Sequence, residues 1–486
     1  EDVRRIVDTG TELKIEEIRP VENYVRITGK LYFRILYLNV SSDPKPGVLE
    51  GKLPFEEMVY AENQEGEEFY VQNVRIEFTP SLIHSRKLSL RAMVELEVGR
   101  EKLVDEETVT DAEGDVPLYK KMKKVQLLQL EVTKKDTYRI KEEITIPGTK
   151  ESIGQILFTD ISERKLELRP GQDELIVRGE LFLFCMYLSG DEKPDWISQT
   201  IPYEGRIPCE GISEEMYFSI RHTMEDTLTD LRMDEDGEMR ILGIEGTLAL
   251  HMNFYREESV ELLEDLYSLQ KQCLFDTTEV VCEELLMQNQ SKCKVTERLS
   301  LPELKTDVLQ ILHARGAIQV EHADRTGEGI RVEGILHLSF LYLRGDDAEP
   351  YGSWQGMIPF EHQIECKEMP EETVYNMEQH IEQLQITLVG SESVEIKGIL
   401  TFDTFLRRPV KVWTMENVRE EPLDLEQLEK RPSIVGHIVQ RGEDLWQLAK
   451  QYMTTKEGIM EVNGMQNENV KEGDKLLIFK ENMSIL

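Results

Sequence analysis

The sequence predicts a mainly β protein, with three tandem antiparallel β-sandwich domains followed by a small β-α-α-β domain. Three observations lead to this prediction. A long strand with alternating apolar residues around a central glycine occurs three times, at Gly29, Gly179 and Gly334. Each copy is followed by a turn rich in Gly, Asp or Pro and by a second strand. The final segment, 433–480, differs in pattern and has apolar residues at helical spacing.

The long strand is the clearest element of each repeat. Strict alternation of apolar residues is typical of a half-buried antiparallel strand, and the glycine near its middle suggests a bulge or bend. The glycines lie roughly 150 residues apart, which indicates a domain repeat and is too long for a solenoid. The alternating series are Val25, Ile27, Gly29, Leu31, Phe33, Ile35 and Tyr37; Leu175, Val177, Gly179, Leu181, Leu183, Cys185 and Tyr187; and Ile330, Val332, Gly334, Leu336, Leu338, Phe340 and Tyr342.

The other shared elements define the domains. The second strand of the hairpin ends in an aligned proline (Pro54, Pro202, Pro359), and a later strand begins at Leu88, Ile244 and Ile396. Short helices are expected at 152–157 and 305–312, where apolar spacing is nearer three or four. The expected domains are 1–117, 136–262, 293–416 and 433–480, with linkers near 118–135, 262–294 and 417–432.

The first repeat differs from the other two at its start. Copies two and three open with a strand that leads to Ile146-Pro147 and Leu301-Pro302, whereas copy one has no such start. Its Arg19-Pro20 aligns with Arg169-Pro170, which places Glu1 several residues inside the domain. We therefore expect the first domain to lack its opening strand, either because the chain is truncated or because that strand comes from elsewhere.

Composition limits the classes of partner. The 486-residue chain has a formal net charge of −37, which argues against binding to nucleic acid or to anionic membranes. Residues 433–480 are nearly neutral, so the excess charge lies in the repeats. This excess negative charge either keeps the protein soluble or binds a basic partner or cations. No apolar run is long enough to cross a membrane. The six cysteines form no CxxC pair, which favours a reducing compartment and hence the cytosol.

Enzyme motifs are missing from the sequence. It contains no GxSxG, HExxH or GxxxxGK[ST] pattern, and its nine histidines are scattered without ligand spacing. We therefore expect no catalytic residues, no metal site and no cofactor. A hydrolase with an unrecognised active site remains an alternative.

The final segment, which we call the terminal domain (433–480), resembles the LysM domain, a module that binds N-acetylglucosamine polymers. Asp444 is a good N-cap, with Gln447 three residues on. The register of Val439, Gly442 and Gly473 matches the family. The resemblance implies a core containing Trp446, Leu448, Tyr452, Ile459, Leu476 and Ile478.

The same resemblance implies a binding groove between two loops, which we call the first loop (442–445) and the second loop (463–467). Two features depart from the family. Glu443 and Asp444 stand where Asp followed by Thr or Ser is usual, and Phe479 replaces a proline. A second carboxylate in a groove for a neutral sugar is costly unless it is paired. The groove residues are Gly442, Glu443, Asp444, Leu445, Asn463, Gly464, Met465, Gln466 and Asn467.

Taken together, the three repeats and the terminal domain resemble SipL-like spore-coat morphogenesis proteins, in which tandem β-rich SPOCS domains precede one LysM domain. The resemblance implies a non-enzymatic scaffold in the mother-cell cytoplasm, at the forespore surface. Its implied partners are the coat ATPase, stage IV sporulation protein A, and other coat proteins. A peptidoglycan-binding wall protein is the alternative. The sequence leaves self-association open.

Overall fold

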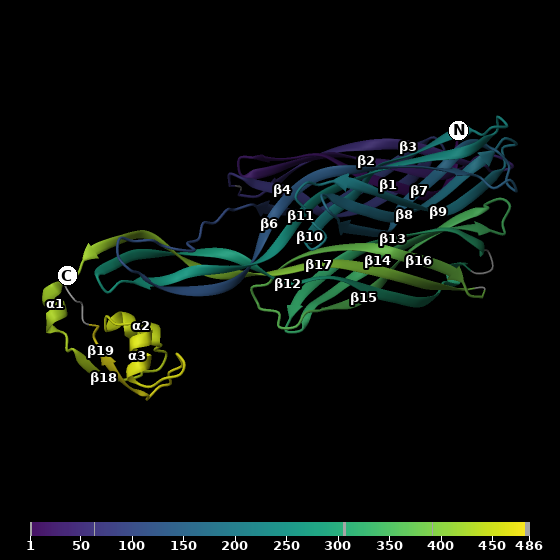
Figure 1. Ribbon diagram of the computed structural model, residues 1–486. Helices are drawn as coiled ribbons and strands as arrows, with labels where there is room; N and C mark the ends of the chain where they lie inside the picture. The colour runs from purple at the N-terminus through teal and green to yellow at the C-terminus, as the bar shows by residue number, and fades with distance from the viewer. Residues whose placement is uncertain (1, 63, 305–307, 391, 482–486) are drawn as a thin grey trace. The chain divides into compact units, whose positions relative to one another are not determined.

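The computed structural model describes residues 2–62, 64–304, 308–390 and 392–481, and divides the chain into two compact units (Figure 1). The first unit, which we call the repeat body, comprises Glu1–Val104, Leu130–Arg256 and Leu286–Arg407. The second, the terminal unit, comprises Asp105–Gln129, Glu257–Leu285 and Arg408–Leu486. The fold is mainly β, as predicted. No helix in the described part of the chain is long and apolar enough to span a membrane.

The second repeat is a sandwich of two three-stranded sheets. One sheet has the order β7-β8-β9 and the other β10-β11-β6. Leu181 of the first sheet and Leu248 of the second are fully buried in the core between them. The strands are β6 (Tyr119–Thr145), β7 (Ile153–Pro170), β8 (Glu174–Ser189), β9 (Pro194–Pro208), β10 (Tyr217–Met233) and β11 (Met239–Tyr267).

The third repeat has the same architecture. Its sheets have the orders β13-β14-β15 and β12-β17-β16, and one core fills the space between them. A short 3₁₀ turn, η1 (Pro302–Leu304), follows the opening strand. The strands are β12 (Lys271–Ser300), β13 (Val308–Thr326), β14 (Gly329–Arg344), β15 (Tyr351–Glu365), β16 (Val374–Leu388) and β17 (Ser393–Pro422).

The first repeat has one sheet of order β1-β2-β3 and a second sheet that contains only β4 and β5 among the described residues. β1 corresponds to β7 and β13, so the strand equivalent to β6 and β12 is missing from this part of the chain. That the first domain lacks its opening strand stays a prediction. The strands are β1 (Val3–Val21), β2 (Tyr24–Asn39), β3 (Pro46–Tyr60), β4 (Glu67–His84) and β5 (Lys87–Lys102).

The central glycines lie beside bulges. The bulge is in the neighbouring strand, where the register shifts between Ile15 and Glu17 opposite Gly29. Equivalent shifts occur opposite Gly179 and Gly334. Each glycine also lies beneath a cross-strand aromatic ring that a Cβ atom would overlap, from Phe55, Tyr203 or Phe360. The glycine is therefore needed for close packing across the strands.

The predicted helices are wrong where they can be compared. Residues 153–157 begin β7, and residues 308–312 begin β13, while Lys305–Asp307 lie outside the described residues. The helix-like spacing has a physical cause. Register shifts between Ile153 and Gln155, and between Ile156 and Phe158, interrupt the alternation of the strand.

The expected linkers at 118–135 and 262–294 are also wrong. β6 occupies the first segment from Tyr119 onward, and β11 and β12 occupy the second apart from the turn at 268–270. The third expected linker, 417–432, contains the end of β17 and the helix α1 (Leu425–Lys430). The polar composition that suggested tethers belongs to strand ends that lie in the terminal unit.

The three sandwiches of the repeat body meet at a shared apolar cluster. Its members occupy equivalent positions of the repeats: Val7, Leu157 and Leu312 from the first strand of each, with Leu36, Met186 and Leu341 from the second. All are buried. The repeats are thus arranged around a pseudo-threefold axis within one chain.

The contacts between repeats obey the same pseudo-threefold symmetry. Arg315 of the third repeat binds both carboxylate oxygens of Asp8 in the first, at 2.7 and 2.6 Å. Asp160 of the second repeat lies 2.7 Å from the Nε2 atom of His313 in the third. Gly10 of the first repeat faces Phe158 of the second. The same pair of positions is therefore in contact at all three interfaces, with different residues each time.

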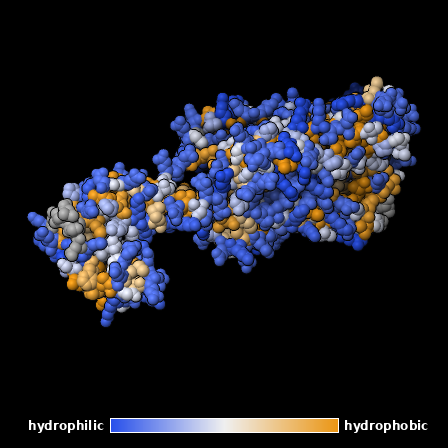
Figure 2. All heavy atoms as spheres, viewed as in Figure 1, coloured by the Kyte–Doolittle hydropathy of each residue, from blue (hydrophilic) through white to orange (hydrophobic). Residues whose placement is uncertain are grey.

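The terminal unit contains the ends of long strands and the terminal domain. Leu127, Leu262, Val280 and Val412 form a small core among the ends of β6, β11, β12 and β17. The terminal domain consists of β18 (Ile434–Ile438), α2 (Leu445–Gln451), α3 (Lys456–Val462) and β19 (Lys475–Phe479), as its β-α-α-β pattern predicted. The visible face of both units is largely hydrophilic (Figure 2).

Candidate functional site

The first loop of the terminal domain is held by its own carboxylates. Gly442 adopts φ +86°, and the Glu443 carboxylate accepts a hydrogen bond from the backbone N–H of Gln440 at 2.7 Å. The same carboxylate lies 2.7 Å from the Nε2 atom of His437. These hydrogen bonds hold the pKa of Glu443 below its ordinary value. The carboxylate that departs from the LysM pattern is therefore paired within the loop.

Asp444 has two structural contacts. One carboxylate oxygen accepts a hydrogen bond from the backbone N–H of Gln447 at 2.8 Å and caps α2. The other accepts one from the Lys121 ammonium at 3.1 Å. Lys121 lies on β6 within the terminal unit. Leu445 is buried, and Glu443 and Asp444 are partly buried. Gly442 is therefore the one well-exposed residue of this loop.

The second loop is fastened by Asn463. Its side-chain amide donates to the carbonyl oxygens of Ile459 and Leu477, each at 2.8 Å, and accepts from the Leu477 N–H at 2.8 Å. Met465 packs against the core of the domain. Gly464, Gln466 and Asn467 are exposed. The solvent-facing part of the loop thus presents two carboxamides.

The residues expected in the core lie there. Trp446, Leu448, Ile459, Leu476 and Ile478 are buried, and Tyr452 is half-buried against them. α3 has Thr455 as its N-cap, and the Thr455 side-chain oxygen accepts a hydrogen bond from the Gly458 N–H at 2.9 Å.

Trp446 is further held by the end of β11. Its indole N–H donates to Asp265 at 2.8 Å, and Lys450 donates to the other oxygen of the same carboxylate at 2.6 Å. Tyr267 packs edge-on against the indole, with ring centroids 5.0 Å apart, and its hydroxyl donates to the carbonyl oxygen of Thr454 at 2.8 Å. The indole is therefore engaged within the terminal unit and is not placed to stack on a sugar ring.

Sequence reasoning missed Lys121, Asp265 and Tyr267 because they fall in the segments read as linkers. The signal that could have found them is the alternation at the end of β11, where Leu263, Asp265 and Tyr267 lie on one side of the strand. Such alternation in a supposed linker indicates a partly buried strand.

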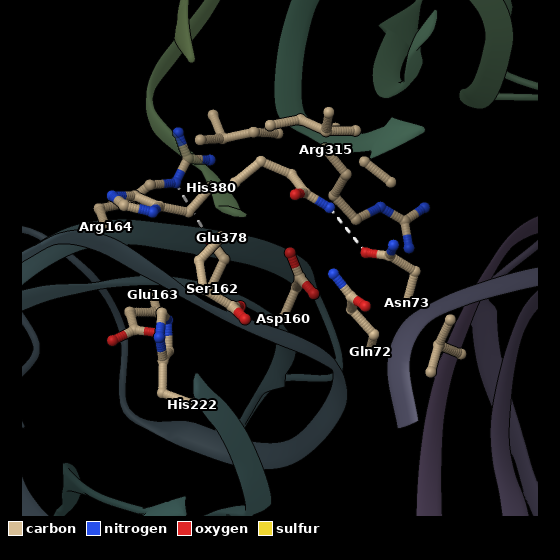
Figure 3. Close-up of a pocket in the computed structure, with 16 residues that line it drawn as sticks. Gln72, Asn73, Asp160, Ser162, Glu163, Arg164, His222, Arg315, Glu378 and His380 are labelled. Carbon is tan, nitrogen blue, oxygen red and sulfur yellow. Dashed lines mark hydrogen bonds and ion pairs between the residues drawn. The ribbon is translucent and has the colours of Figure 1, made fainter. Parts of the chain in front are cut away.

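A second site is a polar cavity of about 420 Å³ inside the repeat body, lined by all three repeats (Figure 3). Gln379 of the third repeat donates to the side-chain oxygen of Asn73 in the first at 2.7 Å. The rings of His222 and His380 lie 6.2 Å apart, although sequence showed these histidines as scattered. The fold thus gathers titratable groups that are distant in the chain.

In this cavity, buried carboxyl groups lie close to buried histidines, and the two shift each other's pKa values. Glu163 lies 3.4 Å from His222 and accepts a hydrogen bond from the Tyr203 hydroxyl at 3.1 Å. Burial opposes the charged forms, but the contact between Glu163 and His222 outweighs it, raising the pKa of His222 and lowering that of Glu163. Burial raises the pKa of Glu378 to about 7. Glu378 therefore keeps its proton to a higher pH than an exposed carboxyl does.

Comparison with known families agrees with this architecture. The SipL, SPOCS domain model matches residues 2–79, 152–232 and 307–389, and the LysM domain model matches residues 437–479. The chain belongs to the SipL family of SPOCS-domain proteins. Its three SPOCS domains indicate a role related to sporulation, and its LysM domain makes peptidoglycan a candidate ligand. Both are binding-type, non-catalytic domains. No curated protein and no solved structure matches the chain.

Proposed function

We propose that this protein is a non-enzymatic scaffold of the spore coat. It links the coat ATPase, stage IV sporulation protein A, to other coat components through its LysM domain and its SPOCS domains. It acts in the mother-cell cytoplasm, at the surface of the forespore.

The arrangement of the two LysM loops is the observation that supports a protein partner. Neither loop contains an aromatic residue, and Trp446 is held by Asp265 in the terminal unit. The carboxylates of the first loop are engaged by contacts within the terminal unit, whereas the second loop exposes Gln466 and Asn467. Flat aromatic faces are what sugar rings commonly stack on, whereas exposed carboxamides suit hydrogen bonding to a protein surface.

The test is copurification of the coat ATPase with the full chain. Removal of residues 433–486 is expected to abolish recovery of the ATPase. The double variant Gln466→Ala, Asn467→Ala is expected to weaken binding by about tenfold, since loss of hydrogen bonds worth about 1.4 kcal/mol has that effect. Glu429→Ala, exposed on α1 outside the LysM domain, is the matched control and should leave binding unchanged. Full recovery with the deletion would refute the proposal.

Binding to peptidoglycan is the second candidate, and the LysM match favours it. It predicts that the full chain sediments with insoluble peptidoglycan and that the same double variant stays in the supernatant. If the parent chain also stays in the supernatant, this candidate fails. Release of soluble glycan fragments in the same experiment would instead indicate a hydrolase.

A further inference from the structure

A pocket of about 530 Å³, which we call the basic pocket, is lined by the second and third SPOCS domains within the repeat body. Four of its charged lining residues are bases and two are acids, although the chain as a whole has a formal net charge of −37. Part of its wall is apolar and includes Phe182 and Val295. The pocket is therefore locally basic within an acidic protein. Its charged residues are Arg164, Lys165, Lys294, Lys397, Glu180 and Glu382.

Two cations of the basic pocket have no counter-charge. Arg164 and Lys294 form no ion pair with any residue that the structure describes, whereas both acids of the lining are already paired with lysines. The pairs around the pocket are Glu180 with Lys165 at 3.1 Å, Glu382 with Lys292 at 2.7 Å, and Lys397 with Glu395 at 2.9 Å. The pocket thus keeps two positive charges that its own acids do not neutralise.

Arg164, which also lines the central cavity (Figure 3), is the more buried of these two cations. Its Nε atom donates a long hydrogen bond to the Ser162 hydroxyl at 3.4 Å, and its guanidinium lies 5.5 Å from the centre of the Phe182 ring. Burial lowers the pKa of this guanidinium, and the charge of Asp160 offsets the effect only in part. Asp160 is itself bound to His313. Because a partly buried cation without a paired carboxylate is costly, an anion in the pocket would stabilise it.

The equivalent residue has a strong partner in each of the other two domains. Lys14, Arg164 and Gln319 occupy the same position of the repeat, since each pairs with the residue that follows the central glycine. Lys14 forms an ion pair with Asp226, which lies at the register shift of β10 in the second domain. The side-chain oxygen of Gln319 lies 2.7 Å from the Nε2 atom of His337. Both side chains are therefore satisfied within the protein.

For Arg164, the corresponding acid is engaged elsewhere. Glu382 lies at the register shift of β16, as Asp226 does in β10, and it lines the same pocket as Arg164. Its carboxylate, however, is held by Lys292 and by the Thr401 hydroxyl. Of the three equivalent residues, Arg164 is thus the one that the described part of the chain leaves without a strong partner.

We propose that the basic pocket binds a small organic oxyanion, a molecule that carries carboxylate or phosphate groups. Arg164 holds one such group through two parallel hydrogen bonds, which the planar guanidinium is shaped to donate. Lys294 attracts the ligand by its charge, and Phe182 and Val295 contact its carbon skeleton. A volume of about 530 Å³ lies within the range of small-molecule sites. This site is separate from the LysM loops and from the proposed scaffold contacts.

The test is isothermal titration calorimetry of the full chain with two probes, citrate and inorganic phosphate. Sodium chloride at about 150 mM screens the acidic surface, so that binding reports the pocket. We expect saturable one-to-one binding of at least one probe. Tighter binding of citrate would assign a carboxylate ligand to the pocket, and tighter binding of phosphate would assign a phosphate ligand. If neither probe binds at millimolar concentrations, the proposal is wrong.

Variants of the full chain localise the binding. Arg164→Met keeps an unbranched apolar side chain and removes the guanidinium, so affinity should fall by at least about tenfold. Lys14→Met is the matched control, because it removes a cation from the equivalent position of the first domain and should leave affinity unchanged. Lys294→Met should weaken binding by about threefold, as expected for an exposed charge.

The stability of the variants separates loss of the site from loss of the fold. Without a probe, Arg164→Met should unfold at a temperature no lower than the parent does, since the substitution breaks no ion pair. Binding that Arg164→Met leaves unchanged would show an adventitious anion only and would overturn the proposal. An equal loss of affinity in Arg164→Met and Lys14→Met would also overturn it.

Discussion

The first and second SPOCS domains contain the same strand pattern, yet only the second has a closed core. In the second, β6 completes the sheet and Met252 is fully buried. In the first, the equivalent Leu96 remains half-buried because no third strand is present among the described residues. The comparison teaches that alternation in a strand predicts which face turns inward, whereas burial depends on the neighbouring strand. Substitutions at matched positions can test this difference.

The largest effect is expected from truncating the core of the closed domain. Met252→Ala should lower the free energy of unfolding of the second domain by about 3 to 4 kcal/mol, since it removes a buried side chain and leaves a cavity. Leu96→Ala in the open domain should cost about 1 kcal/mol. Hydrogen exchange of each domain, measured across a denaturant series, separates the two. Equal losses would show that the first domain is closed in solution.

A somewhat smaller effect is expected on the pH dependence of stability, and it arises from groups of the second and third domains. The first domain contributes the neutral Gln72 and Asn73 to the central cavity, whereas the third contributes Glu378, which faces His222, Arg221 and Asp403. Burial raises the pKa of Glu378 from an ordinary value of 4.5 to about 7. The folded state therefore keeps this proton between these pH values while the unfolded state loses it, and stability falls as pH rises through this window.

Glu378→Gln removes this titration. The variant should be more stable than the parent by about 3 kcal/mol at pH 8, since the pKa of Glu378 rises from 4.5 to about 7 and each pKa unit is worth about 1.4 kcal/mol. The difference should vanish at about pH 4.5. Thermal unfolding at both pH values measures it, and a constant difference across the range would show that Glu378 is not the titrating group.

The smallest effect concerns the central glycines. Here the first domain, and not the second, leaves less room for an added side chain. A Cβ atom on Gly29 would overlap the backbone carbonyl oxygen of Lys14, whereas on Gly179 it would meet a side chain, the ring of Tyr203. Gly29→Ala should therefore cost about 2 kcal/mol, and Gly179→Ala less than about 1 kcal/mol. Chemical denaturation of each variant gives the values. A larger loss at Gly179 would mean that Tyr203 cannot move.

The alternating strands, the hairpins and the terminal domain could be predicted because each rests on local periodicity. The alignment of Arg19-Pro20 with Arg169-Pro170 places Glu1 within the first repeat, in line with the two-stranded sheet of β4 and β5 among the described residues. The helix expected at 152–157 failed because bulges placed Ile153, Ile156 and Leu157 at helical spacing. The sequence alone does not show where an alternation breaks because of a bulge.

The candidate site was harder to predict than the fold. The two loops could be located by register, but the engagement of Trp446 by Asp265 joins residues that are distant in the chain. The shared cluster around Leu36 and Leu341 had a local signal, since apolar residues occur on both faces at the end of the long strand. That signal shows that a second face is buried without showing what buries it.

The pseudo-threefold axis has a consequence for how the domains are ordered along the chain. A symmetric trimer of separate subunits must use one residue pair at all three interfaces. Joined in one chain, the three domains use Asp8 with Arg315, His313 with Asp160, and Phe158 with Gly10. Exchanging the second and third domains would bring Asp160 against Asp8, two carboxylates with no cation between them. The interfaces therefore encode a fixed sequence of domains, so shuffled genes should yield poorly assembled proteins.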